Sequence, residues 1–454
     1  MAAIRTQCCV VGGGPAGMML GFLLARAGVK VEVLEKHADF LRDFRGDTIH
    51  PSTLRFMHEL GLLDEFLKLP HEKAKHLYGQ VGNETFTVAD FTHLPPPANF
   101  LAVMPQWDFL NFLARQGSRY PKFSLRMRTE ATDLISEGGR VVGVTAKTPD
   151  GVIEIRADLV VGTDGRHSLV REKTGLQVED IGAPMDILWF SISRRPNDPA
   201  ETMGRFDKGG IFVLINRGEH WQCGLVIAKG SIERIRAAGL PAFQKDVAER
   251  CPFAAGRISE IRNWDDVKLL TVGVNRLPRW HTPGVLCIGD AAHTMSPVGG
   301  VGVNLAVQDA VAAANILAAP LREGRVTDID LARVQKRRTF AMRVIQRFQI
   351  LVQNRVIRTV LGSTGTLKAP FALRVLGSCP RLQRIPARML GLGVRPERIA
   401  PEIANARNSA IGSINTDGVY VRSGAGELNL AAAQDHLTGP SARIEEHESP
   451  VGGF

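Results

Sequence analysis

The sequence predicts an α/β protein in which a Rossmann-like domain is interleaved with a β-rich domain and followed by C-terminal helices. Three observations predict this fold. A strand, a glycine-rich turn, a helix and a second strand succeed one another within residues 6–35. Two later apolar runs end at Asp164-Gly165 and Gly289-Asp290, as buried strands of the same sheet would. Between these runs, residues 187–228 show alternating strands separated by turn signals.

The first motif is a complete βαβ unit. An apolar strand over 6–11 leads into the G-x-G-x-x-G pattern of Gly12, Gly14 and Gly17, a helix over 15–27, and a second strand over 29–34 that ends at Glu35. Glycines at these positions let the backbone turn tightly and approach a pyrophosphate, and Glu35 can accept hydrogen bonds from a ribose. The unit predicts a dinucleotide site without deciding between NAD and FAD; a glycine-rich turn without a ligand is the alternative.

The loop and helix that follow Glu35 contain two further candidates. Arg45 lies ten residues past Glu35, where it could reach a phosphate, and a solvated loop arginine is the alternative. His50 precedes a helix predicted over 51–60 and is a weak candidate for a catalytic residue; the alternative is a satisfied histidine at a helix start. Residues 70–105 form an excursion from the nucleotide-binding pattern, broken by three consecutive prolines.

Two acidic turns complete the predicted sheet edge. Asp164 could bind a ribityl hydroxyl or only hold its own loop, where Ser168 can cap the next helix. Asp290 can accept hydrogen bonds from a ribityl or ribose chain. A glycine-rich loop follows and leads into an Ala-rich helix over 303–317, whose N-terminal N–H groups and dipole can hold negative charge.

The pattern divides the chain into five regions. The domain that binds FAD or NAD comes in two parts, over 1–180 with the excursion at 70–105 and over 276–320, and a β-rich substrate domain over 181–275 lies between them. A helical region over 321–400 and an extended, partly disordered tail over 401–454 follow. A long basic helix is predicted over 331–361. We expect it to pack its apolar face on the domain rather than to contact a membrane or a partner.

Composition narrows the functional classes. The chain has 454 residues and a net charge of +10, which suits a phosphate-bearing ligand or reflects an Arg-rich composition without a partner. No nucleic-acid module is visible, so nucleic-acid binding is not expected. The six cysteines include no Cys-x-x-Cys pair, which predicts neither a metal site nor disulfides and fits a cytoplasmic protein. We expect no signal peptide, no transmembrane span and no peripheral membrane contact.

Taken together, the three motifs resemble those of the class A flavoprotein monooxygenases, the family of para-hydroxybenzoate hydroxylase-like aromatic hydroxylases. The resemblance rests on Gly12-x-Gly14-x-x-Gly17 with Glu35, on Asp164-Gly165, and on Gly289-Asp290 followed by His293, Pro297, Gly300, Gly302 and Asn304. It covers residues 5–320. The resemblance implies FAD as the bound cofactor and NADPH or NADH as the electron donor.

The resemblance also implies which residues contact FAD. Those at the pyrophosphate and adenosine end would be Gly12, Gly14, Pro15, Ala16, Gly17, Glu35, Lys36 and Ala131. Those along the rest of the cofactor would be Arg45, Gln106, Asp164, Gly289 and Asp290. Those beside the isoalloxazine would be Pro297, Gly300, Val301, Gly302, Val303 and Asn304.

The chemistry implied is the insertion of one oxygen atom, through a flavin C4a-hydroperoxide, into an aromatic or other electron-rich small molecule. The β-rich strands predict an apolar pocket for this substrate, lined by Phe190, Phe212, Leu214, Trp221 and Pro297. The alternative is an FAD-dependent reductase, dehydrogenase or epoxidase acting on an isoprenoid or quinone-like substrate. We expect the small molecule and O2 to be the partners of a monomer or homodimer.

Overall fold

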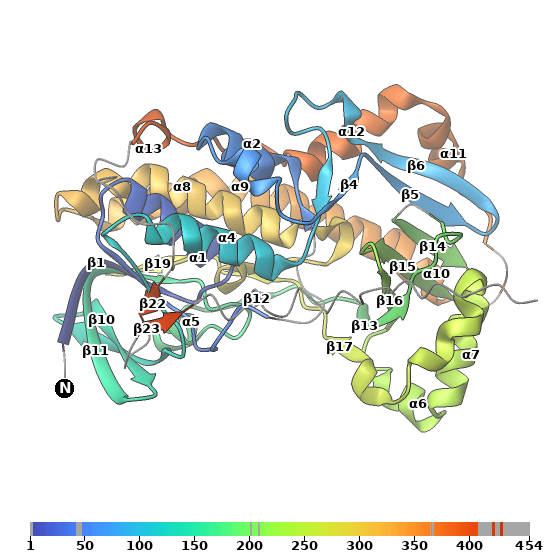
Figure 1. Cartoon of the computed structure of the whole chain (residues 1–454), viewed down its shortest axis with the longest axis horizontal. Coiled ribbons are helices and arrows are strands. Elements are labelled where there is room, and N and C mark those ends of the chain that lie inside the picture. Colours follow the sequence, from blue (N-terminus) through green and yellow to red (C-terminus); the bar gives the residue numbers. More distant parts are fainter. Residues whose placement is uncertain are drawn as a thin grey trace, which may run out of the picture.

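The structure is a computed structural model that describes residues 3–41, 48–199, 202–207, 209–363, 365, 367–406, 420–422 and 427–429. Figure 1 shows two parts side by side. A helix-covered sheet contains the N-terminal strand β1, and a second sheet runs along the right-hand side from β5 and β6 to β17, with α6 and α7 at the lower right. Arg45 and most of the predicted tail over 401–454 lie outside the described residues.

The first sheet is built around five parallel strands in the order β20-β11-β1-β2-β8. Their bounds, with those of the antiparallel strands β9, β10 and β19 that extend the sheet, are β1 Ala3–Val11, β2 Val31–Leu34, β8 Phe123–Arg126, β9 Glu130–Glu137, β10 Arg140–Thr148, β11 Gly151–Gly162, β19 His281–Thr282 and β20 Val285–Cys287. All four residues of β2 are buried, as expected for a parallel strand covered on both faces. Because carboxyl ends of parallel strands share one edge, the three sequence motifs come to the same edge of this sheet.

Long helices cover this sheet. They are α1 Pro15–Arg26, α4 Gln106–Ser118, α8 Gly302–Arg322 and α9 Asp328–Val352, and a π-helical segment Gln353–Ile357 joins α9 to α10 Arg358–Leu361. Figure 1 shows α1, α4, α8 and α9 gathered above the sheet. The predicted helix over 331–361 is therefore present, and its apolar residues Leu331, Val334, Met342 and Ile345 are buried.

One helical stretch bears on the expectation that the chain has no transmembrane span. Among the described residues, Val298–Arg322 is long and apolar enough to cross a membrane by length and composition alone. However, 78% of its apolar window is buried inside the protein, where α8 packs on α1 and α9. The composition of α8 is thus that of a core helix.

The second sheet has seven strands in the order β17-β13-β16-β15-β14-β5-β6. Their bounds are β5 His76–Val81, β6 Glu84–Asp90, β13 Met185–Ser193, β14 Met203–Asp207, β15 Gly210–Asn216, β16 His220–Ala228 and β17 Lys268–Leu270. The excursion at 70–105 contributes β5 and β6 to it, and β5 pairs in parallel with β14. The pairing of these distant segments has no local signal in the sequence and was not predicted from it.

The two faces of the seven-stranded sheet pack against different elements. One face packs against α6 Ile232–Ala237, α7 Leu240–Arg250 and the 3₁₀ segment Pro252–Glu260. The other face packs against Ile357 and Val360 around α10, and against Val298 of the glycine-rich loop. Side chains alternate between the faces along each strand, so neighbouring residues in β13 belong to different cores.

The remaining elements connect these layers. They are α2 Pro51–Glu59, α3 Leu63–Phe66, α5 Leu169–Lys173, α11 Phe371–Ser378, α12 Pro380–Gly391, α13 Pro401–Ala404, β3 Thr48–Ile49, β4 Glu72–Ala74, β7 Leu101–Val103, β12 Glu179–Asp180, β18 Asn275–Arg276, β21 His293–Thr294, β22 Tyr420–Arg422 and β23 Glu427–Asn429. The division into domains at 180, 275 and 320 stays a proposal, because the second sheet takes strands from both sides of the first boundary.

Candidate functional site

The G-x-G-x-x-G turn lies between β1 and α1. A Cβ on Gly12, whose φ is +108°, would lie 2.6 Å from the Thr163 carbonyl oxygen, and one on Gly17 would lie 2.0 Å from the Gly12 carbonyl oxygen. A Cβ on Gly14 would meet nothing within 4 Å. Gly12 and Gly17 therefore let strand and helix pack closely. Gly14 leaves open space at the N-terminus of α1, which fits a pyrophosphate.

Glu35 lies beneath the same turn at the end of β2. Its Oε2 accepts a hydrogen bond from the Gly13 N–H at 3.1 Å, and its Oε1 accepts one from the His37 N–H at 3.0 Å. Each carboxylate oxygen can accept a further hydrogen bond, so these contacts are compatible with binding of a ribose hydroxyl. Lys36, beside it, is exposed.

The three sequence motifs meet at this edge. Thr163, next to Asp164, donates its hydroxyl proton to the carbonyl oxygens of Val11 and Gly12 at 2.9 and 2.7 Å. A Cβ on Gly289 would lie 3.2 Å from the Cβ of Ala16, so the Gly289-Asp290 turn packs against the start of α1. Residues more than 270 positions apart in the chain thus surround the open space at Gly14.

The carboxylate of Asp164 accepts hydrogen bonds from its own loop. Its Oδ1 accepts a hydrogen bond from Ser168 Oγ at 2.5 Å, and its Oδ2 accepts one from the Val170 N–H at 3.2 Å. Ser168 caps α5 as predicted, through the Arg171 N–H at 3.0 Å. Burial raises the pKa of Asp164 despite these hydrogen bonds, which lower it. These contacts favour the structural alternative for Asp164.

Asp290 is more accessible than Asp164. Its side chain is 38% exposed, and Arg166 Nε lies 3.7 Å from its Oδ2. A carboxylate with this exposure keeps acceptor capacity for the hydroxyls of a sugar-alcohol chain. Its position beyond β20 and before the glycine-rich loop fits the predicted role beside a ribityl chain.

Asp309 of α8 holds the Gly289-Asp290 turn from inside the protein. Its Oδ2 accepts hydrogen bonds from the Gly289 N–H at 3.2 Å and from His293 Nε2 at 2.6 Å, and its Oδ1 accepts one from Arg338 Nε at 2.8 Å. Asp309 and Arg338 are fully buried. Burial raises the pKa of Asp309, but His293 and Arg338 outweigh it and hold the pKa below its usual range. This cluster was not among the predicted site residues, although a single acid within an Ala-rich apolar helix was a signal for it.

The glycine-rich loop and the start of α8 form the other end of the site. Gly299 and Gly300 have φ of +78° and +64°, which only glycine adopts without strain. Helix α8 begins at Gly302 with no side-chain cap, and a Cβ there would meet nothing within 4 Å. The free N–H groups and the helix dipole at this point can stabilise negative charge on a ligand.

The other predicted residues of this loop serve the fold. Val301 is buried, and Val303 packs partly buried against the main core. The Asn304 side chain is engaged inside the protein, since its Oδ1 accepts a hydrogen bond from Ser52 Oγ. Any contact of Asn304 with a cofactor would therefore come from its backbone.

His50 lies between the glycine-rich loop and α12. It is 1% exposed, and its Nδ1–H donates a hydrogen bond to the Leu390 carbonyl oxygen at 2.8 Å. Thr48 Oγ1 lies 3.4 Å from its Nε2, and a Cβ on Gly300 would lie 3.6 Å from the same nitrogen. Burial lowers the pKa of His50, although hydrogen bonds to Leu390 and Gly300 raise it. The geometry favours a neutral, positioning histidine over a catalytic one.

Gln106 and Ala131, also predicted to contact FAD, lie on two further elements. Gln106 is the first residue of α4 and is partly exposed. Ala131 lies in β9 opposite Ala146 and packs partly buried against the main core. Their contacts with FAD stay predictions from the resemblance.

The four aromatic and aliphatic residues predicted to line the pocket lie on the α7 face of the second sheet. Phe190, Phe212, Leu214 and Trp221 are at most 1% exposed there. The Phe190 ring lies 5.6 Å from that of Phe243 in α7, and Trp221 Nε1 donates a hydrogen bond to Asp198 at 3.0 Å. These contacts assign the four side chains to packing, and we carry no pocket role forward for them.

The opposite face of the seven-stranded sheet packs against the glycine-rich loop that follows Pro297, and other side chains lie on it. Trp189 belongs to the cluster that includes Val298, the residue after Pro297. Gln222 points to this face from β16, two residues before Gly224, which pairs with Trp189. The indole N–H of Trp189 and the Nε2 of Gln222 are buried and have no hydrogen-bond partner among the described residues. Two such donors on one face are available to a ligand with oxygen acceptors.

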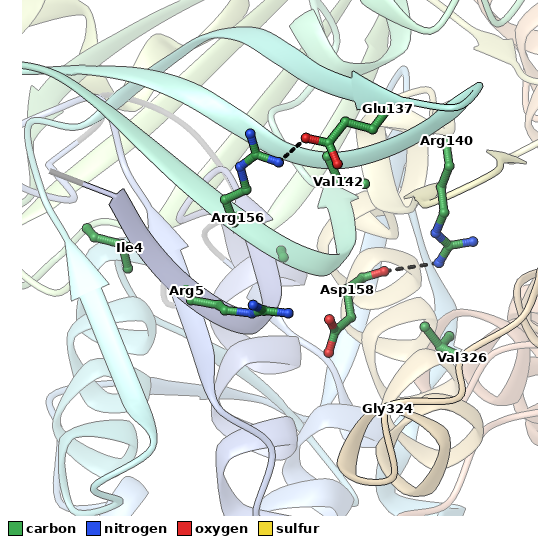
Figure 2. Close-up of a pocket in the computed structure, with 10 residues that line it drawn as sticks. Ile4, Arg5, Glu137, Arg140, Val142, Arg156, Asp158, Gly324 and Val326 are labelled. Carbon is green, nitrogen blue, oxygen red and sulfur yellow. Dashed lines mark hydrogen bonds and ion pairs between the residues drawn. The ribbon is translucent and has the colours of Figure 1, made fainter. Parts of the chain in front are cut away.

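A cavity of about 710 Å³ lies at the other end of the first sheet (Figure 2). It is lined by Arg5 near the start of β1, while the glycine-rich turn follows the end of that strand. Arg156 pairs with Glu137, and Arg140 donates a hydrogen bond to the Asp158 carbonyl oxygen at 3.1 Å. No group of three or more potential metal ligands occurs within the described ranges. Since this cavity lies at the end of the sheet opposite to the three motifs, the candidate site is the edge that contains the motifs.

A comparison with known protein families identifies the family of the chain. The profile of the FAD binding domain family matches residues 5–348, which include all three motifs. The chain belongs to this family. It is an FAD-dependent monooxygenase, with NAD(P)H as the electron donor general to such enzymes.

Relatives of this monooxygenase span most of its length. The 6-methylpretetramide 4-monooxygenase of Streptomyces rimosus is 30% identical over 404 residues, which cover 88% of this chain and 95% of that protein. The digeranylgeranylglycerophospholipid reductase 2 of Methanothermobacter thermautotrophicus is 26% identical over 350 residues, covering 74% and 83%. The p-nitrophenol 4-monooxygenase PnpA from Pseudomonas putida DLL-E4 has the same fold, with a TM-score of 0.68, 21% identity, and coverage of 85% and 97%.

Proposed function

We propose that this monooxygenase hydroxylates an oxygen-bearing aromatic molecule that lies between the loop after Pro297 and the sheet face of Trp189 and Gln222. The observation that carries the substrate assignment is the pair of buried N–H donors, of Trp189 and Gln222, that have no partner among the described residues and lie on the face packed against Val298. An aromatic ring suits the apolar surroundings, and a phenolic or carbonyl oxygen suits the donors. The 30% identical relative acts, by its name, on 6-methylpretetramide, which makes that compound the first to test.

We assign each end of FAD to a part of the site. Open space at Gly14 and the N-terminus of α1 would receive the pyrophosphate, and Glu35 the adenosine ribose. Asp290 would hold the ribityl chain. The start of α8 at Gly302 would stabilise negative charge at the N1–C2=O edge of the ring system. Bound FAD supplies the redox chemistry that takes electrons from NAD(P)H and activates O2.

No side chain is assigned as the catalytic base. His50 was the sequence-based candidate, and its buried, hydrogen-bonded ring instead positions Thr48 and Gly300. The protein's contribution is then placement of the substrate against the loop, exclusion of water by the apolar side chains packed around Trp189, and electrostatic support from α8.

The test is NADPH and NADH oxidation with simultaneous measurement of O2 uptake. The panel contains 6-methylpretetramide, simple phenols, quinones and polycyclic aromatics. We expect at least one aromatic to accelerate NAD(P)H oxidation and to give a product heavier by one oxygen atom. Flavin reduction without oxygen incorporation across the whole panel would contradict the hydroxylase proposal.

The second candidate is a reductase or epoxidase acting on an isoprenoid or quinone-like substrate. The observation that favours it is the 26% identical relative named for the reduction of a digeranylgeranylglycerophospholipid. The same assay with an isoprenoid lipid separates the candidates. A reductase consumes no O2 for product formation, whereas an epoxidase consumes O2 and adds one oxygen atom to the isoprenoid and not to an aromatic ring. A cytoplasmic monomer or homodimer remains part of the proposal.

A further inference from the structure

The charges of the chain are strongly segregated. Residues 331–396 contain fourteen Lys and Arg residues and no Asp or Glu. The whole chain has a net charge of +10, so the remainder carries net negative charge. The excess of positive charge is therefore a property of the C-terminal helical region.

Exposed apolar side chains gather in the same region. Seven of the twelve large hydrophobic side chains exposed in the described part of the chain lie within residues 331–396. On α11, which has no buried residue, Phe371 is 83% exposed, and Val375 follows one turn later. On α12, Ile385 is 64% exposed and Leu382 lies one turn before it. Exposed apolar residues at helical spacing on two consecutive helices mark an interaction surface.

Basic side chains alternate with these apolar ones. Arg381, Arg384 and Arg388 are exposed on α12, and none takes part in an ion pair with an acidic residue that the structure describes. Arg374 on α11 pairs with Glu84 at 2.7 Å. The outer faces of α11 and α12, called the C-terminal surface below, are thus both apolar and positively charged.

The two helices are held in place from their inner side. A Cβ on Gly377 of α11 would lie 2.7 Å from the Phe86 ring of β6, so this helix packs closely on the second sheet. Gln383 Nε2 donates hydrogen bonds to the carbonyl oxygens of Leu376 and Gly377 at 3.2 and 3.0 Å, which tie α12 to α11. Because the inner side is packed, the exposed apolar side chains cannot be buried by closing the helices onto the protein.

We propose that the C-terminal surface binds an anionic lipid membrane. Apolar side chains of the two helices would enter the headgroup region, and the arginines would contact lipid phosphates. This occupant is chosen by charge complementarity, since Arg381, Arg384 and Arg388 stand beside the apolar residues and pair with no acidic residue that the structure describes. The inference goes beyond the proposed function, does not depend on flavin chemistry, and replaces the sequence-based expectation of no peripheral membrane contact.

Helix α12 connects the C-terminal surface to the candidate site. The Leu390 carbonyl oxygen near the end of this helix accepts the hydrogen bond from His50, and a Cβ on Gly299 would lie 2.7 Å from Leu390 Cδ2. Membrane binding at the outer face of α12 would therefore bring the loop after Pro297 close to the lipid surface. A lipid-soluble aromatic substrate could then reach the site from the membrane.

The experiment is flotation of the full-length, FAD-loaded protein with vesicles. One set contains equal parts of phosphatidylglycerol and phosphatidylcholine, and the other contains phosphatidylcholine alone. We expect binding to the anionic vesicles only, weakened by about 0.5 M salt, which shortens the screening length to a few ångström. The double variant Arg381→Gln/Arg384→Gln should bind about 25-fold more weakly, at about five-fold for each lost charge. Phe371→Ser/Ile385→Ser should bind at least about tenfold more weakly.

The matched control is Lys147→Gln/Val152→Ser, which changes one exposed basic and one exposed apolar residue paired across β10 and β11. It should bind like the unaltered protein. Thermal unfolding and FAD content should be the same for all variants, because every altered side chain is exposed. Absence of binding to anionic vesicles, or equal binding by the control and both surface variants, overturns the proposal.

Two other occupants give distinct results, and either one overturns the proposal. If a second copy covers the surface, light scattering shows a dimer that Phe371→Ser/Ile385→Ser dissociates, and vesicles do not bind. If the acidic end of the chain covers it, vesicles bind only after Glu445→Gln/Glu446→Gln/Glu448→Gln. Because the readout is lipid binding, its failure is distinguishable from failure of the oxygenation assay.

Discussion

The substitution Gly14→Ala separates the two uses of glycine in the nucleotide-binding turn. A Cβ at Gly14 would meet nothing within 4 Å in the protein, and its backbone is extended, with φ of −72° and ψ of −176°. Alanine adopts this conformation without strain. The fold should therefore tolerate the methyl group, while a pyrophosphate seated at the start of α1 should not.

The substitution should raise the free energy of unfolding of the cofactor-free protein and weaken its binding of FAD. Alanine restricts the unfolded chain, so the cofactor-free protein should gain about 0.4–1 kcal/mol in its free energy of unfolding. A methyl group forced against a bound ligand costs about 1–3 kcal/mol, as overpacking does in a protein core, and the dissociation constant for FAD should rise roughly 5- to 150-fold. The matched control is Gly17→Ala, whose Cβ would lie 2.0 Å from the Gly12 carbonyl oxygen. This control should lower the free energy of unfolding itself.

The assay combines two measurements on the same preparations. Urea unfolding of the cofactor-free protein gives the stability change, and quenching of FAD fluorescence on titration gives the dissociation constant. Unchanged FAD affinity in Gly14→Ala, with stability kept or raised, would refute the assignment of this space to the pyrophosphate. A loss of stability as large as that of Gly17→Ala would refute the reading of Gly14 as free of packing contacts.

Three further predictions follow from buried groups. Asp309→Asn leaves Arg338 buried without its closest counter-charge. It should therefore lower the free energy of unfolding, measured with urea, by about 3 kcal/mol. A loss below about 1 kcal/mol would contradict the role of this cluster. Burial raises the pKa of Asp198, but the guanidinium of Arg257 outweighs it and lowers the pKa from 3.8 to about 2. Its contribution, about 2 kcal/mol, should be complete above pH about 4 and lost as the pH falls toward 2, and acid unfolding of Asp198→Asn should lack this slope. Trp189→Phe keeps the ring and removes the unpartnered N–H, so KM for the aromatic substrate should rise about tenfold with FAD affinity unchanged; an unchanged KM would remove Trp189 from the substrate site.

The nucleotide-binding part could be predicted because its signals are local. The strand, turn and helix around Gly12–Gly17 are adjacent in sequence, and each has its own backbone requirement. The Asp164 and Asp290 turns were recognisable because each interrupts an apolar run. The bounds of β1, α1 and α8 accordingly differ from prediction by only a few residues.

The β-rich part was harder because it depends on contacts between distant residues. Both Trp189 and Phe190 are apolar and buried, since the sheet is covered on both faces, so alternation alone does not tell which face meets the loop. The burial of Phe190 beneath α7 required knowing where Phe243 packs. Similarly, the Asp309 cluster needs Arg338 from a different helix, and nothing near Asp309 in sequence announces that partner.

The pairing of β5 with β14 also constrains the order in which the chain can fold. Met203 is opposite Tyr78, and Cys287 is opposite Gly162, so each sheet is completed by residues synthesised long after its first strands. Contacts of such large sequence separation form slowly, and unpaired strand edges are prone to aggregation in the meantime. We expect newly made chains to expose the edge of β5 until β14 has left the ribosome and the edge of β11 until β20 has left it. Such chains should require chaperones in the meantime.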